Sequence, residues 1–161
     1  MLSDYKSLLE IRLAQYDDIP CIMEIIAEAF SKYQTMSGAE HLDALYETAE
    51  DIKHDIDTML VLVALSDGHP VGSVRVEIFP DNTAYLTRFA VKTDNQNNGI
   101  GKSIMNLVDK IMRKEGVKTI SLHTGSKVTA LIRFYYGRGF YIDEIDKSKG
   151  YTRAKLVKEY N

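Results

Sequence analysis

The sequence has little of what secreted, membrane-spanning or metal-holding proteins require. Of its 161 residues only Cys21 is a cysteine, so no internal disulfide can form, and no cysteine and histidine cluster has zinc spacing. No apolar run approaches the roughly 20 residues that a membrane helix needs. The first 10 residues carry early charges and no apolar core, unlike a secretion signal. These absences predict a cytoplasmic protein with neither a metal site nor a membrane as partner.

The sequence also lacks an excess of basic residues. Its formal net charge is −3, which argues against a nucleic-acid partner. It contains no internal repeat, low-complexity tract or Pro/Gly-rich linker, and its length suits one domain, so a single domain over residues 1–161 is expected. The apolar share of 45% and charged share of 27% are ordinary for a globule with a hydrophobic core.

The first half of the chain predicts a strand, two helices and a three-stranded meander. A short strand is expected at Ile11–Ala14, and a helix follows that Asp17 and Asp18 cap and Pro20 enters. Apolar residues at helical spacing predict a second helix over Leu42–Ile56. The meander strands are expected at Met59–Leu65, Val71–Phe79 and Thr83–Val91.

The second half alternates between helices and strands. The expected elements are a helix from about Gly99 to Glu115, a strand at Val117–Leu122, a helix at Ser126–Tyr136 and strands at Phe140–Ile145 and Tyr151–Val157. The complete order is therefore β-α-α-β-β-β-α-β-α-β-β. Hairpins combined with a strand–helix–strand segment predict an α/β fold with a mixed sheet.

A turn containing two glycines joins the third meander strand to the next helix. It reads Gln-Asn-Asn-Gly-Ile-Gly from Gln96, and Lys102 and Ser103 follow. Glycine lets backbone amides approach a ligand closely, and a helix start adds unpaired N–H groups with a partial charge of about +0.5. Such a turn suits a phosphate or pyrophosphate.

Three nucleotide motifs compete for this turn. A Rossmann fingerprint needs a third small residue where Ile104 stands, and a Walker motif needs its first glycine where Gln96 stands. The acetyl-CoA turn, Gln/Arg-x-x-Gly-x-Gly/Ala, matches at Gln96, Gly99 and Gly101. A plain helix start that binds nothing is the remaining alternative.

Two segments together resemble the GNAT superfamily of N-acetyltransferases. Leu86–Val91 and the turn after it resemble the family's fourth strand and pyrophosphate loop. Ala130–Phe140 is similar to the family's helix that ends in a tyrosine, here Tyr135, with Gly-Phe four residues later. The two segments occur in the family's order at a family-like separation, and the resemblance covers most of the chain.

The resemblance implies a GNAT-like fold: a twisted, mostly antiparallel sheet splayed between its fourth and fifth strands and flanked by about four helices. It implies acetyl-CoA as co-substrate, with pantetheine in the splay and the pyrophosphate on the turn. The implied acetyl-CoA-binding residues are Phe89, Ala90, Val91, Gln96, Asn97, Asn98, Gly99, Ile100, Gly101, Lys102 and Ser103.

The sequence departs from the family pattern at two places. Val128 stands where the family often has an asparagine seven residues before its tyrosine. The fourth strand, from Tyr85 to Val91, holds no carboxylate that could serve as general base. The base is left open among Glu28, Glu77, Asp81, His123 and an ordered water chain.

Acyl transfer from a thioester to an amine needs a neutral amine, donors for the oxyanion, and a proton or strong hydrogen bond for the leaving thiolate. Tyr135 shares a helix face with Leu131 and Ile132 and is the predicted general acid; a core aromatic is the alternative. Cys21 lies among apolar residues, and we expect it in the core rather than as a nucleophile.

The expected acceptor is a primary amine of a small molecule or a peptide. The stretch Ser37–Thr58 holds seven acids and one lysine, a local charge of −6, which would attract a cation such as a polyamine; a solvated helix face is the plainer interpretation. Direct acetylation of the amine is the leading function. A catalytically silent acetyl-CoA-binding module is the main alternative, a P-loop phosphotransferase is a distant third, and a homodimer stays open.

Overall fold

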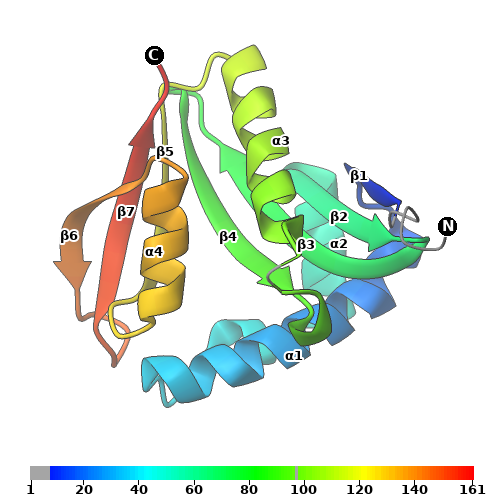
Figure 1. The fold of residues 1–161 in the computed structure, drawn as a ribbon, viewed down its shortest axis with the longest axis horizontal. Helices are drawn as coiled ribbons and strands as arrows, with labels where there is room; N and C mark the ends of the chain where they lie inside the picture. The colour runs from blue at the N-terminus through cyan, green and yellow to red at the C-terminus, as the bar shows by residue number, and fades with distance from the viewer. Residues whose placement is uncertain (1–7, 97) are drawn as a thin grey trace, which may run out of the picture.

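Helices pack on both faces of one mixed sheet (Figure 1). The computed structural model describes residues 8–96 and 98–161. Its strands are β1 (Leu9–Leu13), β2 (Leu60–Ser66), β3 (His69–Ile78), β4 (Thr83–Val91), β5 (Thr119–Gly125), β6 (Tyr141–Asp146) and β7 (Arg153–Glu159). Its α-helices are α1 (Ile19–Ser37), α2 (Ala49–Thr58), α3 (Ile100–Lys114) and α4 (Thr129–Gly137). The predicted order of strands and helices is confirmed.

The sheet opens between β4 and β5. The seven strands run in the order β1-β2-β3-β4-β5-β7-β6, and only β4 and β5 are parallel neighbours among the described strands. These two strands pair through three residues each, Thr83–Tyr85 with Thr119–Ser121, and then diverge (Figure 1). The splayed, mostly antiparallel sheet is confirmed. Beyond Tyr85 one edge of β4 pairs with none of the described strands.

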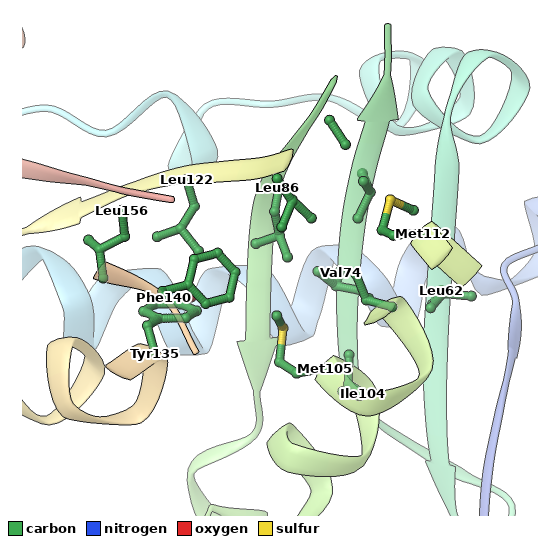
Figure 2. Packing of buried hydrophobic residues seen from close by; sticks show 14 of the residues in the cluster. Leu62, Val74, Leu86, Ile104, Met105, Met112, Leu122, Tyr135, Phe140 and Leu156 are labelled. Carbon is green, nitrogen blue, oxygen red and sulfur yellow. The ribbon is translucent and has the colours of Figure 1, made fainter. Parts of the chain in front are cut away.

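Two cores cover the opposite faces of the sheet because the side chains of each strand alternate. Val61 and Val63 of β2 pack with the isoleucines of α1 and α2. Leu62 and Ala64 of the same strand pack with α3 in the other core, part of which Figure 2 shows. Leu86, Leu122 and Phe140 belong to the second core. Within the described part of the chain, no helix has the length and apolar character to cross a membrane.

The prediction of one continuous helix over Leu42–Ile56 is wrong. A 3-10 turn at Asp43–Leu45 comes first, and α2 begins only after Thr48. Thr48 is extended (φ −100°, ψ 169°); its side chain accepts from the Asp51 amide at 3.2 Å, and the Asp51 carboxylate accepts from the Thr48 amide at 2.8 Å. This capping box satisfies amides that a helix start leaves free, so the helix starts there.

The start of α1 is also capped differently from the prediction. Asp18 precedes the helix, and its carboxylate makes no capping bond to it. It accepts instead from the Arg12 guanidinium at 2.7 and 3.0 Å and from the Gln15 amide at 2.7 Å.

Elements after residue 116 begin within three residues of the predicted positions, an ordinary boundary error.

Candidate active site

A cavity of about 640 Å³ is lined by residues of both β4 and β5, at the place where those strands part. Residues of α1, of α4 and of the turn before α3 complete its wall. The cavity therefore connects the predicted phosphate turn with the opposite face of the sheet, where α1 lies.

A β-bulge shapes the β4 side of the cavity. Ser73 pairs with Ala90 and Arg75 with Thr87, so one residue of β3 faces two of β4, Arg88 and Phe89. Arg88 accommodates the bulge with a positive φ of 53°. A bulge leaves backbone groups without their ladder partners. On the other edge of β4, pairing with β5 ends at Tyr85, so backbone groups beyond it pair with no described strand and can bond a ligand in the cavity.

The turn before α3 has the backbone of an anion site. Gly99 takes a left-handed φ of 78° and precedes the first residue of α3. The Gln96 side chain donates to the Val91 carbonyl at 3.1 Å and ties the turn to β4. The Ser103 amide donates to the Gly99 carbonyl within the helix, whereas the amides of the three residues before it have no helical partner.

Most of the predicted acetyl-CoA-binding residues line the cavity. The lining ones are Phe89, Ala90, Val91, Gln96, Gly99, Gly101 and Lys102. Asn98, Ile100 and Ser103 belong to the same turn and helix start but not to the lining, and Ile100 is buried. Asn97 lies outside the described residues.

Gly101 leaves space that a side chain would fill. A Cβ at this position would lie 3.1 Å from Phe89 Cζ and 3.5 Å from Phe134 Cζ. Those two rings stack with their centroids 5.5 Å apart. The glycine therefore lets the start of α3 approach the aromatic side of the cavity.

Tyr135 faces inward, as its helical spacing predicts. It is 4% exposed, lines the cavity and makes edge contacts with Phe89 and Phe134. It makes a third edge contact with Phe140, which Figure 2 shows beside it. Burial raises the pKa of its phenol far above the ordinary value, so the hydroxyl stays protonated at neutral pH. The next residue, Tyr136, is 50% exposed.

Hydroxyl groups gather on the α1 side of the cavity. Tyr85 Oη lies 2.5 Å from His123 Nδ1, and Tyr33 Oη lies 3.0 Å from Tyr151 Oη. The Gly125 amide donates to Tyr33 at 2.7 Å. We did not single out Tyr33, Tyr85 or Tyr151 from the sequence. For Tyr85 the alternation of side chains along β4 does indicate its direction. Tyr85 shares a strand face with Thr87, and the buried Ala84 and Leu86 lie on the other face.

Of the four side chains considered as base, His123 alone is among the described residues that line the cavity. Glu28 accepts from the Thr93 amide at 2.8 Å, and hydrogen bonds from Thr93 lower its pKa. Asp81 lies in the turn before β4 and accepts hydrogen bonds from the amide and the hydroxyl of Thr83. These bonds lower the pKa of the Asp81 carboxyl. Glu77 is exposed on β3.

The acidic stretch is partly neutralised by arginines of the sheet. Arg75, 1% exposed, contacts Glu47 at 2.7 Å and Asp55 at 2.9 Å, and Arg88 contacts Glu47 at 3.3 Å. Counting both arginines changes the local charge from −6 to −4. Of the seven acids, Asp43 is the one that lines the cavity among described residues.

Comparisons with known proteins identify the family. The model of the acetyltransferase (GNAT) family matches residues 20–140. A spermidine N(1)-acetyltransferase of Thermoplasma acidophilum is 25% identical over 150 residues, covering 87% of this chain and 92% of that protein.

Solved structures share the fold. The PaiA N-acetyltransferase of Thermoplasma acidophilum, in complex with coenzyme A, has a TM-score of 0.84 at 23% identity and covers 95% of this chain and 99% of its own. The ribosomal-protein-S18-alanine N-acetyltransferase of Escherichia coli has a TM-score of 0.77 at 16% identity, covering 94% of each chain. At these identities the two structures support the architecture alone.

Proposed function

Because the chain belongs to the GNAT family of acetyltransferases, we propose that it transfers the acetyl group of acetyl-CoA directly to a primary amine of a small cationic acceptor of the polyamine class. The observation that carries this proposal is the continuous cavity from the Gly99 turn, past Tyr135, to the tyrosines on the α1 side. One end suits a phosphate and the other is lined by tyrosines and Asp43, so both substrates can meet between β4 and β5.

The turn and β4 supply the acetyl-CoA end. Free amides at the start of α3 and the Lys102 side chain would bind the pyrophosphate, since a helix start attracts anions. The unpaired edge of β4 after Tyr85 would bond the amides of pantetheine, and amides at the Arg88 bulge would stabilise the oxyanion.

Tyr135 would give the departing thiolate its proton or a strong hydrogen bond. It lines the same cavity as Phe89 and Val91, and its raised pKa keeps the hydroxyl protonated before the reaction. Cys21 does not belong to the described lining, which supports direct attack over an acyl-enzyme.

The acceptor end would bind a cation through aromatic rings and one carboxylate. Phe30, Tyr33, Tyr85 and Tyr151 line it together with Asp43. The cavity lining also holds Lys32 and Lys149, and Arg88 and Arg153, whose charges Glu47 and Asp146 offset. Ring faces attract ammonium groups, and the attraction grows when the site excludes water. The spermidine N(1)-acetyltransferase similar to this chain also acts, by its name, on a polyamine.

A screen that follows release of the CoA thiol tests the proposal. Spermidine should be acetylated faster than butylamine, which matches its aminobutyl arm but carries a single charge, or than a zwitterionic amino acid, and the preference should weaken as salt screens the attraction. A salt-independent preference for a neutral or acidic acceptor would contradict the polyamine class. Tight binding of acetyl-CoA without turnover of any amine would instead support a silent module.

A further inference from the structure

We propose that His123, held by Tyr85, is the base that accepts the proton of the acceptor ammonium; this assignment rests on the proposed function. An ammonium group cannot attack a thioester, and a free alkylamine with a pKa of about 10.4 is almost wholly protonated at pH 7. The site therefore needs a proton acceptor near the amine, and β4 offers no carboxylate.

The register of the sheet places both residues where the strands part. Tyr85 and Ser121 are the last paired residues of β4 and β5, and His123 follows two residues later on the Ser121 face of β5. Leu86 follows Tyr85 in β4, and Leu122 lies between Ser121 and His123 in β5. Both leucines enter the core beneath α3. Tyr85 and His123 therefore point to the opposite face, toward the acceptor half of the cavity.

The hydrogen bond to Tyr85 orients the imidazole. Tyr85 Oη and His123 Nδ1 are 2.5 Å apart, and the two rings are tilted with centroids 5.6 Å apart. In the tautomer that serves as base, Nδ1–H donates to Tyr85 Oη and leaves the Nε2 lone pair to accept a proton. A base held by a second group in this way keeps its ring orientation during the reaction.

The surroundings of His123 keep it neutral before it acts. The charged and titratable groups facing it are Tyr85 of β4, Glu144 and Asp146 of β6, and Arg153 and Lys155 of β7. Burial is the largest influence and Arg153 the next, and both lower the His123 pKa below the ordinary value of 6.5. The Asp146 carboxylate contacts Arg153, which limits its support of an imidazolium.

The proton balance of the step closes without a further reagent. His123 Nε2 takes one proton from the ammonium, and the neutral nitrogen forms its bond to the thioester carbonyl carbon. The C–S bond breaks, Tyr135 passes its proton to the leaving sulfur, and Tyr135 regains a proton from the acylated nitrogen. His123 then releases its proton to solvent, so one proton leaves per acetyl transferred.

His123→Gln tests the assignment through its pH profile, with spermidine as acceptor. At pH 7 kcat/KM should fall about 100-fold or more, the usual contribution of a general base. The deficit should shrink as pH rises toward the amine pKa, because the amine then loses its proton unaided. Wild-type kcat/KM should decrease as the pH falls through the His123 pKa, which lies below 6.5. This acid limb of the pH profile should be absent from the variant.

Two further variants separate a proton acceptor from a structural residue. Tyr85→Phe keeps the ring and removes the acceptor of Nδ1–H, so the acid limb should move to lower pH with a partial loss of rate. His54→Gln is the control, because His54 is exposed on α2; this variant should keep the wild-type rate and the acid limb of the pH profile. Calorimetric titration of His123→Gln with acetyl-CoA should show wild-type affinity.

The possible failures differ from one another. Unchanged rate and acid limb in His123→Gln, with an active wild type, would overturn the base assignment and leave the acetyltransferase function standing. Equal loss at every pH together with weakened acetyl-CoA binding would assign His123 a structural role and also overturn it. A wild type that acetylates no amine would overturn the proposed function and this assignment with it.

Discussion

At the scale of single residues, Tyr135 shows how burial selects the chemistry of a side chain. Its ring is enclosed by Phe89, Phe134 and Phe140, and the loss of water raises the phenol pKa. A phenol with a raised pKa stays protonated across the physiological range, so before the reaction it can donate a proton or a hydrogen bond but cannot act as a base. This state agrees with a donor to the leaving thiolate and argues against Tyr135 as the base.

Tyr135→Phe removes the hydroxyl and leaves the packed ring. We expect kcat to fall about 100-fold to 10,000-fold, the usual contribution of general acid catalysis, while acetyl-CoA affinity changes little. Steady-state kinetics and calorimetric titration would measure the two quantities.

Tyr136→Phe is the matched control, because this neighbour is 50% exposed. It should keep the wild-type kcat. Equal losses in both variants would point to a disturbed α4, and full activity in Tyr135→Phe would assign the acid to water or another group.

At the scale of elements, α2 depends on its capped start and on one face that contacts the rest of the molecule. Its start is held by the capping box of Thr48 and Asp51, and Ile52 is fully buried in the core with α1. Asp55 on the same helix contacts the buried Arg75 of β3 at 2.9 Å. The helix is therefore attached to the sheet near the acceptor side of the cavity.

Thr48→Ala should weaken the start of α2. Loss of a capping side chain commonly costs about 1 kcal/mol of unfolding free energy, which urea denaturation followed by circular dichroism can measure. Thr58→Ala, at the other end of the helix, should cost less than Thr48→Ala. An unchanged urea midpoint for Thr48→Ala would mean that Ile52 and Asp55, rather than the cap, determine where α2 starts.

At the scale of the whole molecule, the cavity exists because the sheet is continuous at one end and open at the other. The three pairs between β4 and β5 hold the two halves of the sheet together, and the α3 core spans them. Beyond those pairs a ligand can take the place of the missing strand contacts. Binding there should hold both halves in their native arrangement.

Acetyl-CoA should therefore raise the melting temperature of the protein. A ligand that binds only the native state at 100 times its Kd adds about 2.7 kcal/mol of stability, and thermal unfolding with increasing acetyl-CoA would measure the shift. ATP with magnesium should do much less, since Gln96 stands where a P-loop has its first glycine. Strong stabilisation by ATP and none by acetyl-CoA would contradict the interpretation of the Gly99 turn.

Local patterns in the sequence were enough to predict the order of elements, the bounds of β4, the glycine turn and the inward face of Tyr135. Each depends on residues within a few positions of one another, through side-chain periodicity, turn chemistry and the needs of a helix start. The same local rules missed the break at Thr48. Apolar residues keep helical spacing throughout Leu42–Ile56, but the capping box of Thr48 and Asp51 starts the helix only after Thr48.

Only the tertiary structure decided how distant segments meet. The Arg88 bulge follows from the pairing of β3 with β4, and Tyr85 meets His123 across 38 positions of sequence. Arg75 neutralises part of the acidic stretch by contacting Glu47, which lies 28 positions earlier in the sequence. Such contacts depend on strand register and on which faces are buried together, and periodicity within one segment carries no information about either.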